Sequence, residues 1–139
     1  MLIDDSELDI FVHKTVIESL NIAERIQSFT NAVDALNYLK LIEDENAYYR
    51  LFAPQLILLD IDMPLMNGFQ FLNEFDKLEI FKQKPIDIFI VSSAFQPNDI
   101  EATQIKKICS GYFSKPLMGQ KIFNYLKEKS VEKNQVFNH

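Results

Sequence analysis

A carboxylate follows an unbroken apolar run in the middle of the chain. The run Leu56–Leu59 leads directly into Asp60, and Pro64 and Gly68 follow within eight positions. This pattern is typical of a fully buried strand that ends in a loop. In open α/β sheets, ligands bind beyond the carboxyl ends of the strands, so Asp60 is well placed for chemistry. The structural alternative is that Asp60 only caps the turn through its own backbone.

Three other apolar segments also lead into polar side chains. Met1–Ile3 precedes Asp4 and Asp5, Ile86–Val91 precedes Ser92 and Ser93, and Gly111–Ser114 precedes Lys115. If these segments are parallel strands of one sheet, their carboxyl ends share an edge and bring three acids together. A hard divalent cation such as Mg²⁺ relieves the repulsion between crowded carboxylates, and we expect Asp5 and Asp60 to bind it directly. Alternatively, Asp4 and Asp5 merely cap the first helix.

A carboxylate beside Mg²⁺ can attack phosphorus, because the metal neutralises charge on the transferred group. Asp60 is therefore the candidate nucleophile. Lys115 would offer a positive charge to the phosphoryl oxygens, although a lysine considered alone is more often a solvated surface residue. A serine at the end of the neighbouring strand would donate a hydrogen bond to the same group. We prefer Ser92, which directly follows the apolar run, and keep Ser93 as the alternative.

Strand-like and helix-like segments alternate, which predicts a parallel sheet covered by helices on both faces. Strands are expected at 1–3, 24–29, 55–60, 86–91 and 111–114, and helices at 7–20, 31–42, 68–78, 98–108 and 119–128. Right-handed crossovers between these five units favour a flavodoxin-like, doubly wound α/β fold with sheet order 2-1-3-4-5. Strands one and three are neighbours in this order.

Apolar spacing predicts which helix faces point inward. The expected core positions are Leu8, Phe11, Val12, Val16 and Leu20 in the first helix, Ile100, Ile105 and Ile108 in the fourth, and Ile122, Phe123 and Leu126 in the last. His13 and His139 have no second ligand at metal-binding spacing, and we expect both to be ordinary surface groups.

The composition limits the classes of function. The 139 residues, 47% of them hydrophobic, suit one domain, expected at 1–129, followed by a polar tail at 130–139. A net charge of -6 argues against nucleic acid as a direct partner. The sequence shows neither a membrane-spanning run nor a signal peptide, and its single cysteine, Cys109, precludes an internal disulfide. We therefore expect a cytoplasmic protein that does not bind membranes.

Considered in order, these motifs resemble those of receiver domains of two-component response regulators, from Leu2 to Lys127. Asp4-Asp5 is similar to the acidic pair of that family. The segment Asp60–Pro64 with Gly68 is similar to its phosphoacceptor loop, and Gly111–Pro116 to its lysine motif. No single motif is sufficient, but their order and spacing together are highly specific.

The resemblance implies that Asp60 accepts a phosphoryl group from a partner histidine kinase or histidine phosphotransfer protein. It also implies that Asp5, Asp60 and the backbone carbonyl of Asp62 bind Mg²⁺, with Mn²⁺ as an alternative ion, and that Asp4 contributes through water. The chemistry would be limited to self-catalysed phosphoryl transfer and dephosphorylation, so the protein would not be an enzyme with a turned-over substrate. A cis peptide bond is expected at Lys115-Pro116.

Tyr112, three residues before Lys115, matches the switch aromatic of the family. Phosphorylation adds a charge of about -1.5 to -2, so the hydroxyl of Ser92 would move toward the phosphoryl group and Tyr112 would fill the space that it leaves. The surface of the fourth helix, fifth strand and fifth helix would then recruit a downstream protein or a second copy of the chain. Alternatively, Tyr112 is an ordinary half-buried strand residue.

The sequence departs from the receiver pattern at two points, and it leaves two other classes of protein as alternatives. Only Met1–Ile3 precede the acidic pair, so either the first strand is abbreviated or the sequence begins late in it, and Asp62 adds negative charge beside the expected site. The segment Leu58–Asp62 also resembles the nucleophile motif of haloacid-dehalogenase-type phosphatases, but such enzymes need an acidic pair downstream of their lysine, and only isolated acids follow Lys115. A phosphorylation-independent adaptor is the other alternative, although it would not require the intact acids and lysine.

Overall fold

The computed structural model describes residues 1–44, 49–83, 85–93, 96–117 and 119–137. Its strands are β1 (Leu2–Ile3), β2 (Ser28–Phe29), β3 (Leu56–Leu59), β4 (Asp87–Ser92) and β5 (Gly111–Ser114). Its helices are α1 (Glu7–Ser19), α2 (Ala32–Asp44), the 3₁₀ helix η1 (Tyr49–Phe52), α3 (Gly68–Phe75), α4 (Ile80–Gln83), α5 (Asp99–Ile108) and α6 (Gly119–Phe137). The predicted alternation of strands and helices is confirmed.

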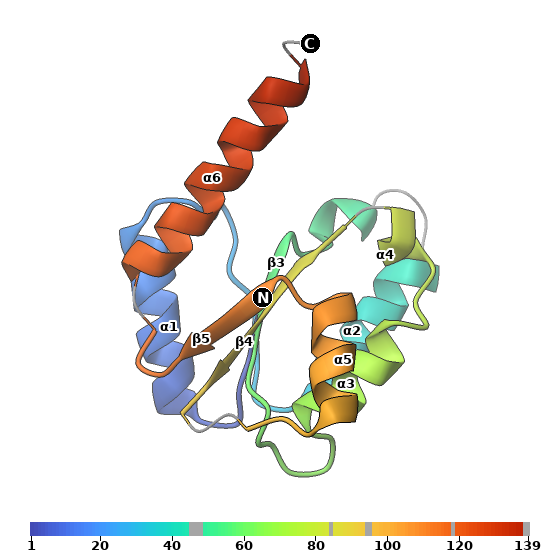
Figure 1. Cartoon of the computed structure of the whole chain (residues 1–139). Coiled ribbons are helices and arrows are strands. Elements are labelled where there is room, and N and C mark those ends of the chain that lie inside the picture. The colour runs from blue at the N-terminus through green and yellow to red at the C-terminus, as the bar shows by residue number, and fades with distance from the viewer. Residues whose placement is uncertain (45–48, 84, 94–95, 118, 138–139) are drawn as a thin grey trace.

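A five-stranded parallel sheet forms the centre of the structure, in the order β2-β1-β3-β4-β5. Helices α1 and α6 cover one face, and α2, α3 and α5 cover the other (Figure 1). This arrangement confirms the doubly wound α/β fold and the predicted strand order. Ile3 is aligned with Leu59, so the residues that follow β1 and β3 emerge side by side at one edge of the sheet.

Each face of the sheet contributes to a separate half of the core, because alternate strand residues point to opposite faces. On the side of α2 and α3, the buried core includes Ile57, Leu59, Phe71, Leu72, Ile88 and Ile90. On the side of α1 and α6, it includes Leu2, Ile10, Ile17, Leu58, Phe89, Val91 and Ile122. Each such side chain contributes roughly 1.5–3 kcal/mol of transfer free energy when fully buried. These two layers fix β3 and β4 firmly.

A polar cluster at the N-terminal end of β4 attaches α6 to the sheet. The carboxylate of Asp87 accepts hydrogen bonds from Ser110 Oγ at 2.9 Å and from Tyr125 Oη at 3.1 Å, and it forms an ion pair with Lys129. The ring of Tyr125 also packs edge-on against Phe89, with 4.7 Å between the ring centroids. Three groups that follow β4 in the chain thus converge on its first residue.

The buried face of α1 differs from the prediction in the first half of the helix, whereas Val16 and Leu20 pack against the core as expected. Leu8, Phe11 and Val12 are 71%, 67% and 37% exposed, whereas Ile10 and His13 are buried. The exposed and the buried apolar positions of α1 both follow helical spacing, so periodicity could not show which set faces the core. The sheet, α6 and the segment after β5 determine which set is covered. The prediction that His13 is a surface residue was therefore wrong, and His139 lies outside the described residues.

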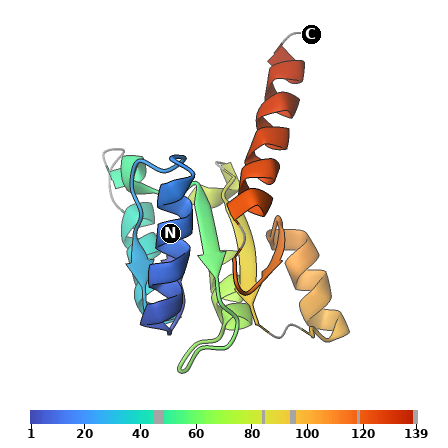
Figure 2. The same ribbon diagram turned by 90° about the vertical axis from the view of Figure 1, so that its left-hand side faces the viewer.

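Other differences concern element ends and two further helical positions. Helix α6 continues to Phe137, beyond the expected end near residue 128, because residues 120–137 contain no Gly or Pro and many strong helix formers. The prediction of a non-helical tail was therefore wrong for residues 130–137, although this part of α6 projects away from the sheet (Figure 2). The strand expected at 24–29 is only Ser28–Phe29, since β1 offers two residues for pairing. Ile100 and Phe123 are exposed rather than in the core.

None of the helices in the described ranges combines the length and apolar character that a bilayer crossing needs.

Candidate functional site

Three carboxylates meet at the carboxyl edge of the sheet. Asp4 and Asp5 follow β1, and Asp60 follows β3. The backbone N–H of Asp60 donates to the carbonyl oxygen of Ile3 at 2.9 Å, which continues the strand pairing up to the acids. One carboxylate oxygen from each acid lies within 4.8 Å of the other two. The structure thus brings together the three acids that the sequence placed at this edge.

The acids differ in burial and in electrostatic environment. Asp4 and Asp60 are 3% and 6% exposed, whereas Asp5 is exposed. Burial, reinforced by the charge of Asp4, raises the pKa of Asp60 to about 6, although Lys115 acts in the opposite direction. The protein therefore compensates the charge of Asp60 only in part. An oxygen-rich cluster with uncompensated negative charge fits Mg²⁺, which prefers a few carboxylate oxygens and several waters.

Lys115 enters this cluster from the end of β5. Its Nζ lies 2.8 Å from Asp4 Oδ2, 2.9 Å from Asp9 Oδ2 and 3.6 Å from Asp60 Oδ1. Although burial lowers the pKa of Lys115, its close contacts with the carboxylates of Asp4 and Asp9 outweigh that effect and raise this pKa well above its usual value. The ammonium group is therefore permanently charged. The cis peptide bond expected at Lys115-Pro116 is present.

Asp9 was missed by sequence reasoning as part of the site. It lies in the first turn of α1, and its N–H donates to Ser6 Oγ at 3.2 Å. Its side chain contacts Lys115, which is 106 positions away in the chain. The available signal was its position one helical turn after Asp5, at the same edge of the sheet.

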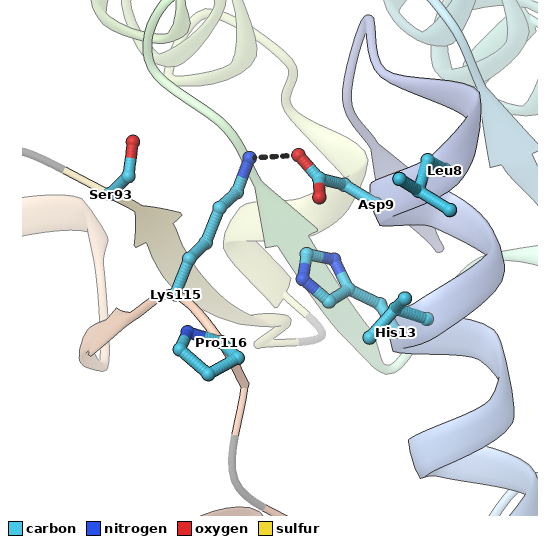
Figure 3. A pocket seen from close by; sticks show the side chains of 7 residues that line it. Leu8, Asp9, His13, Ser93, Lys115 and Pro116 are labelled. Atoms are coloured by element: carbon cyan, nitrogen blue, oxygen red, sulfur yellow. Dashed lines mark hydrogen bonds and ion pairs between the residues drawn. The ribbon is translucent and has the colours of Figure 1, made fainter.

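An open hollow of about 460 Å³ lies beside Lys115. It is lined by Leu8, Asp9, Val12, His13, Ser93, Lys115 and Pro116. Figure 3 shows the Lys115 side chain extending between Ser93 and α1, with its ammonium group against Asp9 and the His13 ring facing Lys115 and Pro116. Burial lowers the pKa of His13, and the charge of Asp4 offsets this effect only in part. A neutral imidazole therefore forms part of the wall.

The two candidate serines occupy different environments. Ser92 ends β4 and is 1% exposed, whereas Ser93 is exposed and lines the hollow. The carbonyl oxygen of Ser92 accepts hydrogen bonds from the Lys115 N–H at 3.0 Å and from the Tyr112 hydroxyl at 3.4 Å. Tyr112 is 39% exposed. Which of the two serine hydroxyls contacts a phosphoryl group stays a prediction.

The loop after Asp60 is closely packed against the start of α3. The Gly68 N–H donates to the carbonyl oxygen of Ile61 at 2.9 Å, and a Cβ on Gly68 would lie 2.8 Å from the carbonyl oxygen of Asp60. Asn67 caps α3 through a reciprocal capping box with Gln70. Only glycine fits at position 68 without displacing the backbone that holds Asp60. Asp62 is exposed in this loop, and a role for its carbonyl in metal binding stays a prediction.

The doubly wound fold, the acid cluster and the opposed lysine define a receiver-type site. The family model of the response regulator receiver domain matches residues 1–127, so the chain belongs to this family. The match argues against the haloacid-dehalogenase-type alternative. Receiver domains act in two-component systems with histidine kinases or phosphotransfer proteins, and they generally bind Mg²⁺ in an acidic pocket. No curated protein sequence matches the chain significantly.

Several solved structures are similar over nearly their whole length. A two-component response regulator from Cytophaga hutchinsonii is 28% identical with a TM-score of 0.75, covering 99% of this chain and 95% of that one. A response regulator receiver protein from Dyadobacter fermentans is 25% identical with a TM-score of 0.71, covering 91% and 93%. A two-component response regulator from Legionella pneumophila is 28% identical with a TM-score of 0.69, covering 91% and 96%.

Proposed function

We propose that this chain is a phosphorylation-controlled receiver in which Asp60 accepts a phosphoryl group from the phosphohistidine of a kinase or phosphotransfer protein. The observation that supports this most directly is the cluster at the sheet edge: Asp60 lies within 4.8 Å of two further acids and 3.6 Å from Lys115. A nucleophilic carboxylate, an oxygen-only set of metal ligands and a permanent positive charge occur together there. We place the protein in the cytoplasm, where such kinases present their phosphohistidine.

In the transfer, an oxygen of the Asp60 carboxylate forms a bond to phosphorus and the P–N bond to the donor imidazole breaks. The electron pair of that bond stays on the imidazole nitrogen, which takes up a proton. Lys115, whose Nζ lies 3.6 Å from Asp60 Oδ1, contacts the incoming phosphoryl oxygens. Asp5, Asp60 and the Asp62 carbonyl are proposed to hold Mg²⁺ or Mn²⁺, with Asp4 acting through water; the ion neutralises charge on the transferred group.

Signalling is proposed to proceed through β4 and β5. The Ser92 hydroxyl turns toward the phosphoryl group, and the Tyr112 ring moves into the space that this hydroxyl leaves. This movement changes the surface of α5, β5 and α6, which then binds a downstream protein or a second copy of the chain. The chemistry is self-catalysed phosphorylation and dephosphorylation, without turnover of another substrate.

The test is intact-mass measurement after incubation with acetyl phosphate and Mg²⁺. We expect the wild-type protein to gain one phosphoryl group, and Asp60→Asn to gain none. Asp62→Asn is the matched control, since it removes an adjacent exposed acid but keeps the backbone carbonyl. Chelation of the metal is expected to abolish the gain. A wild-type protein that stays unmodified would support the phosphorylation-independent adaptor instead.

A further inference from the structure

Asp9 is one of the three carboxylates that contact Lys115, although it does not belong to the cluster of Asp4, Asp5 and Asp60 that could bind a metal ion. Its Oδ2 lies 2.9 Å from Lys115 Nζ, nearly as close as Asp4 Oδ2 at 2.8 Å and closer than Asp60 Oδ1 at 3.6 Å. We propose that Asp9 is a positioning residue that holds Lys115 toward α1 and away from Asp60 until a phosphoryl group arrives. This inference rests on the proposed phosphorylation of Asp60.

The geometry gives Asp9 a direct effect on where the lysine points. An ammonium group has three donor hydrogens, and two of the three nearby carboxylates lie at hydrogen-bond distance from Nζ. The phosphoacceptor is the carboxylate left beyond that distance. In Figure 3 the Asp9 carboxylate approaches the ammonium group from α1, on the side away from Ser93. The contact with Asp9 thus draws Lys115 toward α1.

Burial determines which of the two close contacts of Lys115, with Asp4 or with Asp9, breaks first. The side chain of Asp4 is 4% exposed, whereas that of Asp9 is 36% exposed. Water can replace the lysine at Asp9 at little cost, but a buried Asp4 without its partner would be strongly destabilised. When a phosphoryl group adds negative charge at Asp60, Lys115 therefore exchanges Asp9 for a phosphoryl oxygen and keeps Asp4.

This exchange affects both the rate of phosphorylation and the surface of α1. Before transfer, the hold by Asp9 opposes the approach of Lys115 to the reacting group, so phosphorylation is slower than the site would otherwise allow. After transfer, Asp9 is left as an unpaired carboxylate at the rim of the hollow. The phosphorylation state of Asp60 is thereby transmitted as a charge to the first turn of α1.

The test compares Asp9→Asn with two further variants. Asp9→Glu keeps the charge and should behave like the wild type. Glu7→Gln removes an exposed acid from the same turn of α1 and controls for the general effect of charge at the helix N-terminus. In magnesium-free buffer, the ¹⁵N resonance of Lys115 Nζ is expected to shift, and its protons to exchange faster with water, in Asp9→Asn but not in Glu7→Gln.

The second measurement is the rate of phosphorylation by acetyl phosphate at saturating Mg²⁺. We expect Asp9→Asn to react roughly two- to fivefold faster than wild type, the factor that corresponds to losing a partly exposed ion pair, and Glu7→Gln to keep the wild-type rate. An Asp9→Asn rate equal to or below that of wild type, or an unchanged Lys115 resonance, would overturn the inference alone. A wild-type protein that takes up no phosphoryl group would overturn the proposed function as well.

Discussion

The Nζ of Lys115 lies 3.6 Å from Oδ1 of Asp60, which is ion-pair distance but too long for a hydrogen bond. The two residues follow β5 and β3, which are separated by β4 in the sheet. Their proximity therefore depends on the strand order rather than on any local turn. Lys115 therefore compensates the charge of Asp60 only in part.

Asp60→Asn is expected to stabilise the magnesium-free protein at about pH 7.5. Burial and the charge of Asp4 raise the pKa of Asp60 from 3.8 to about 6, so the folded state loses stability as the pH rises through that interval. Asn does not titrate, and the free energy of unfolding should increase by on the order of 1–3 kcal/mol. Urea denaturation measures this change in the free energy of unfolding. Mg²⁺ is expected to stabilise the wild type and leave the variant nearly unchanged; an equal gain in both would contradict the assigned metal site.

Gly68→Ala is expected to destabilise the loop that carries Asp60. The new Cβ would lie 2.8 Å from the Asp60 carbonyl oxygen and 2.9 Å from the Ile61 Cα, and these backbone atoms cannot move independently of the loop. We expect a loss of on the order of 1–3 kcal/mol in thermal or urea unfolding. Gly119→Ala is the control, because its Cβ would meet only the side chains of Val16 and Leu20, at 3.3 Å or more. Equal losses in both variants would show that the close backbone contact is unimportant.

Asp87→Asn is expected to weaken the attachment of α6. Burial by itself raises the pKa of Asp87, but hydrogen bonds from Lys129, Ser110 and Tyr125 outweigh it and hold the pKa below its usual 3.8. The carboxylate therefore stabilises the fold above about pH 4, and this contribution is lost as the pH falls through the lowered pKa. At neutral pH we expect a loss of about 1–3 kcal/mol.

The difference between wild type and Asp87→Asn should shrink in acid, as followed by urea unfolding at several pH values. Asp76→Asn is the matched control, since Asp76 pairs with Lys107 at 3.2 Å but both side chains are largely exposed. Its loss should stay below about 1 kcal/mol. A pH-independent deficit in Asp87→Asn would show that packing, rather than the charged contacts, holds α6.

His13→Leu is expected to change the response of stability to mild acid. Burial lowers the pKa of His13 below 6.5, so the unfolded chain binds more protons than the folded one below that pH. Stability should therefore fall as the pH drops through 6.5, and His13→Leu should lose less. The comparison is best made in an Asp60→Asn background, which removes the opposite titration of Asp60. Identical pH slopes would show that His13 does not remain neutral in the folded protein.

The sequence was sufficient to predict the fold and the acid cluster because both depend on strand order. Asp4 and Asp60 each follow an apolar run, and parallel neighbouring strands bring such positions together without further information. The inward face of α1 could not be predicted in the same way, since Phe11 and Ile10 belong to overlapping stripes and only the covering segments select between them. The contact of Asp9 with Lys115 is equally a product of tertiary structure.

Helix α6 shows a different limit of sequence analysis. Its composition after Ser130 predicts a polar tail, yet Lys, Glu and Gln favour a helix where no Gly or Pro interrupts it. Composition alone does not distinguish a solvated helix from a solvated coil when most of the residues are polar. The attachment at Asp87 fixes the earlier part of α6, and the helix continues outward from there.

Strand β4 begins at Asp87 and ends at Ser92, so the anchor of α6 and the edge that carries the acid cluster lie roughly 17 Å apart along one extended segment. The acid cluster and the anchor of α6 therefore lie at opposite ends of the same strand. At that separation, substitutions in the acid cluster and in the Asp87 anchor should have additive effects on the free energy of unfolding.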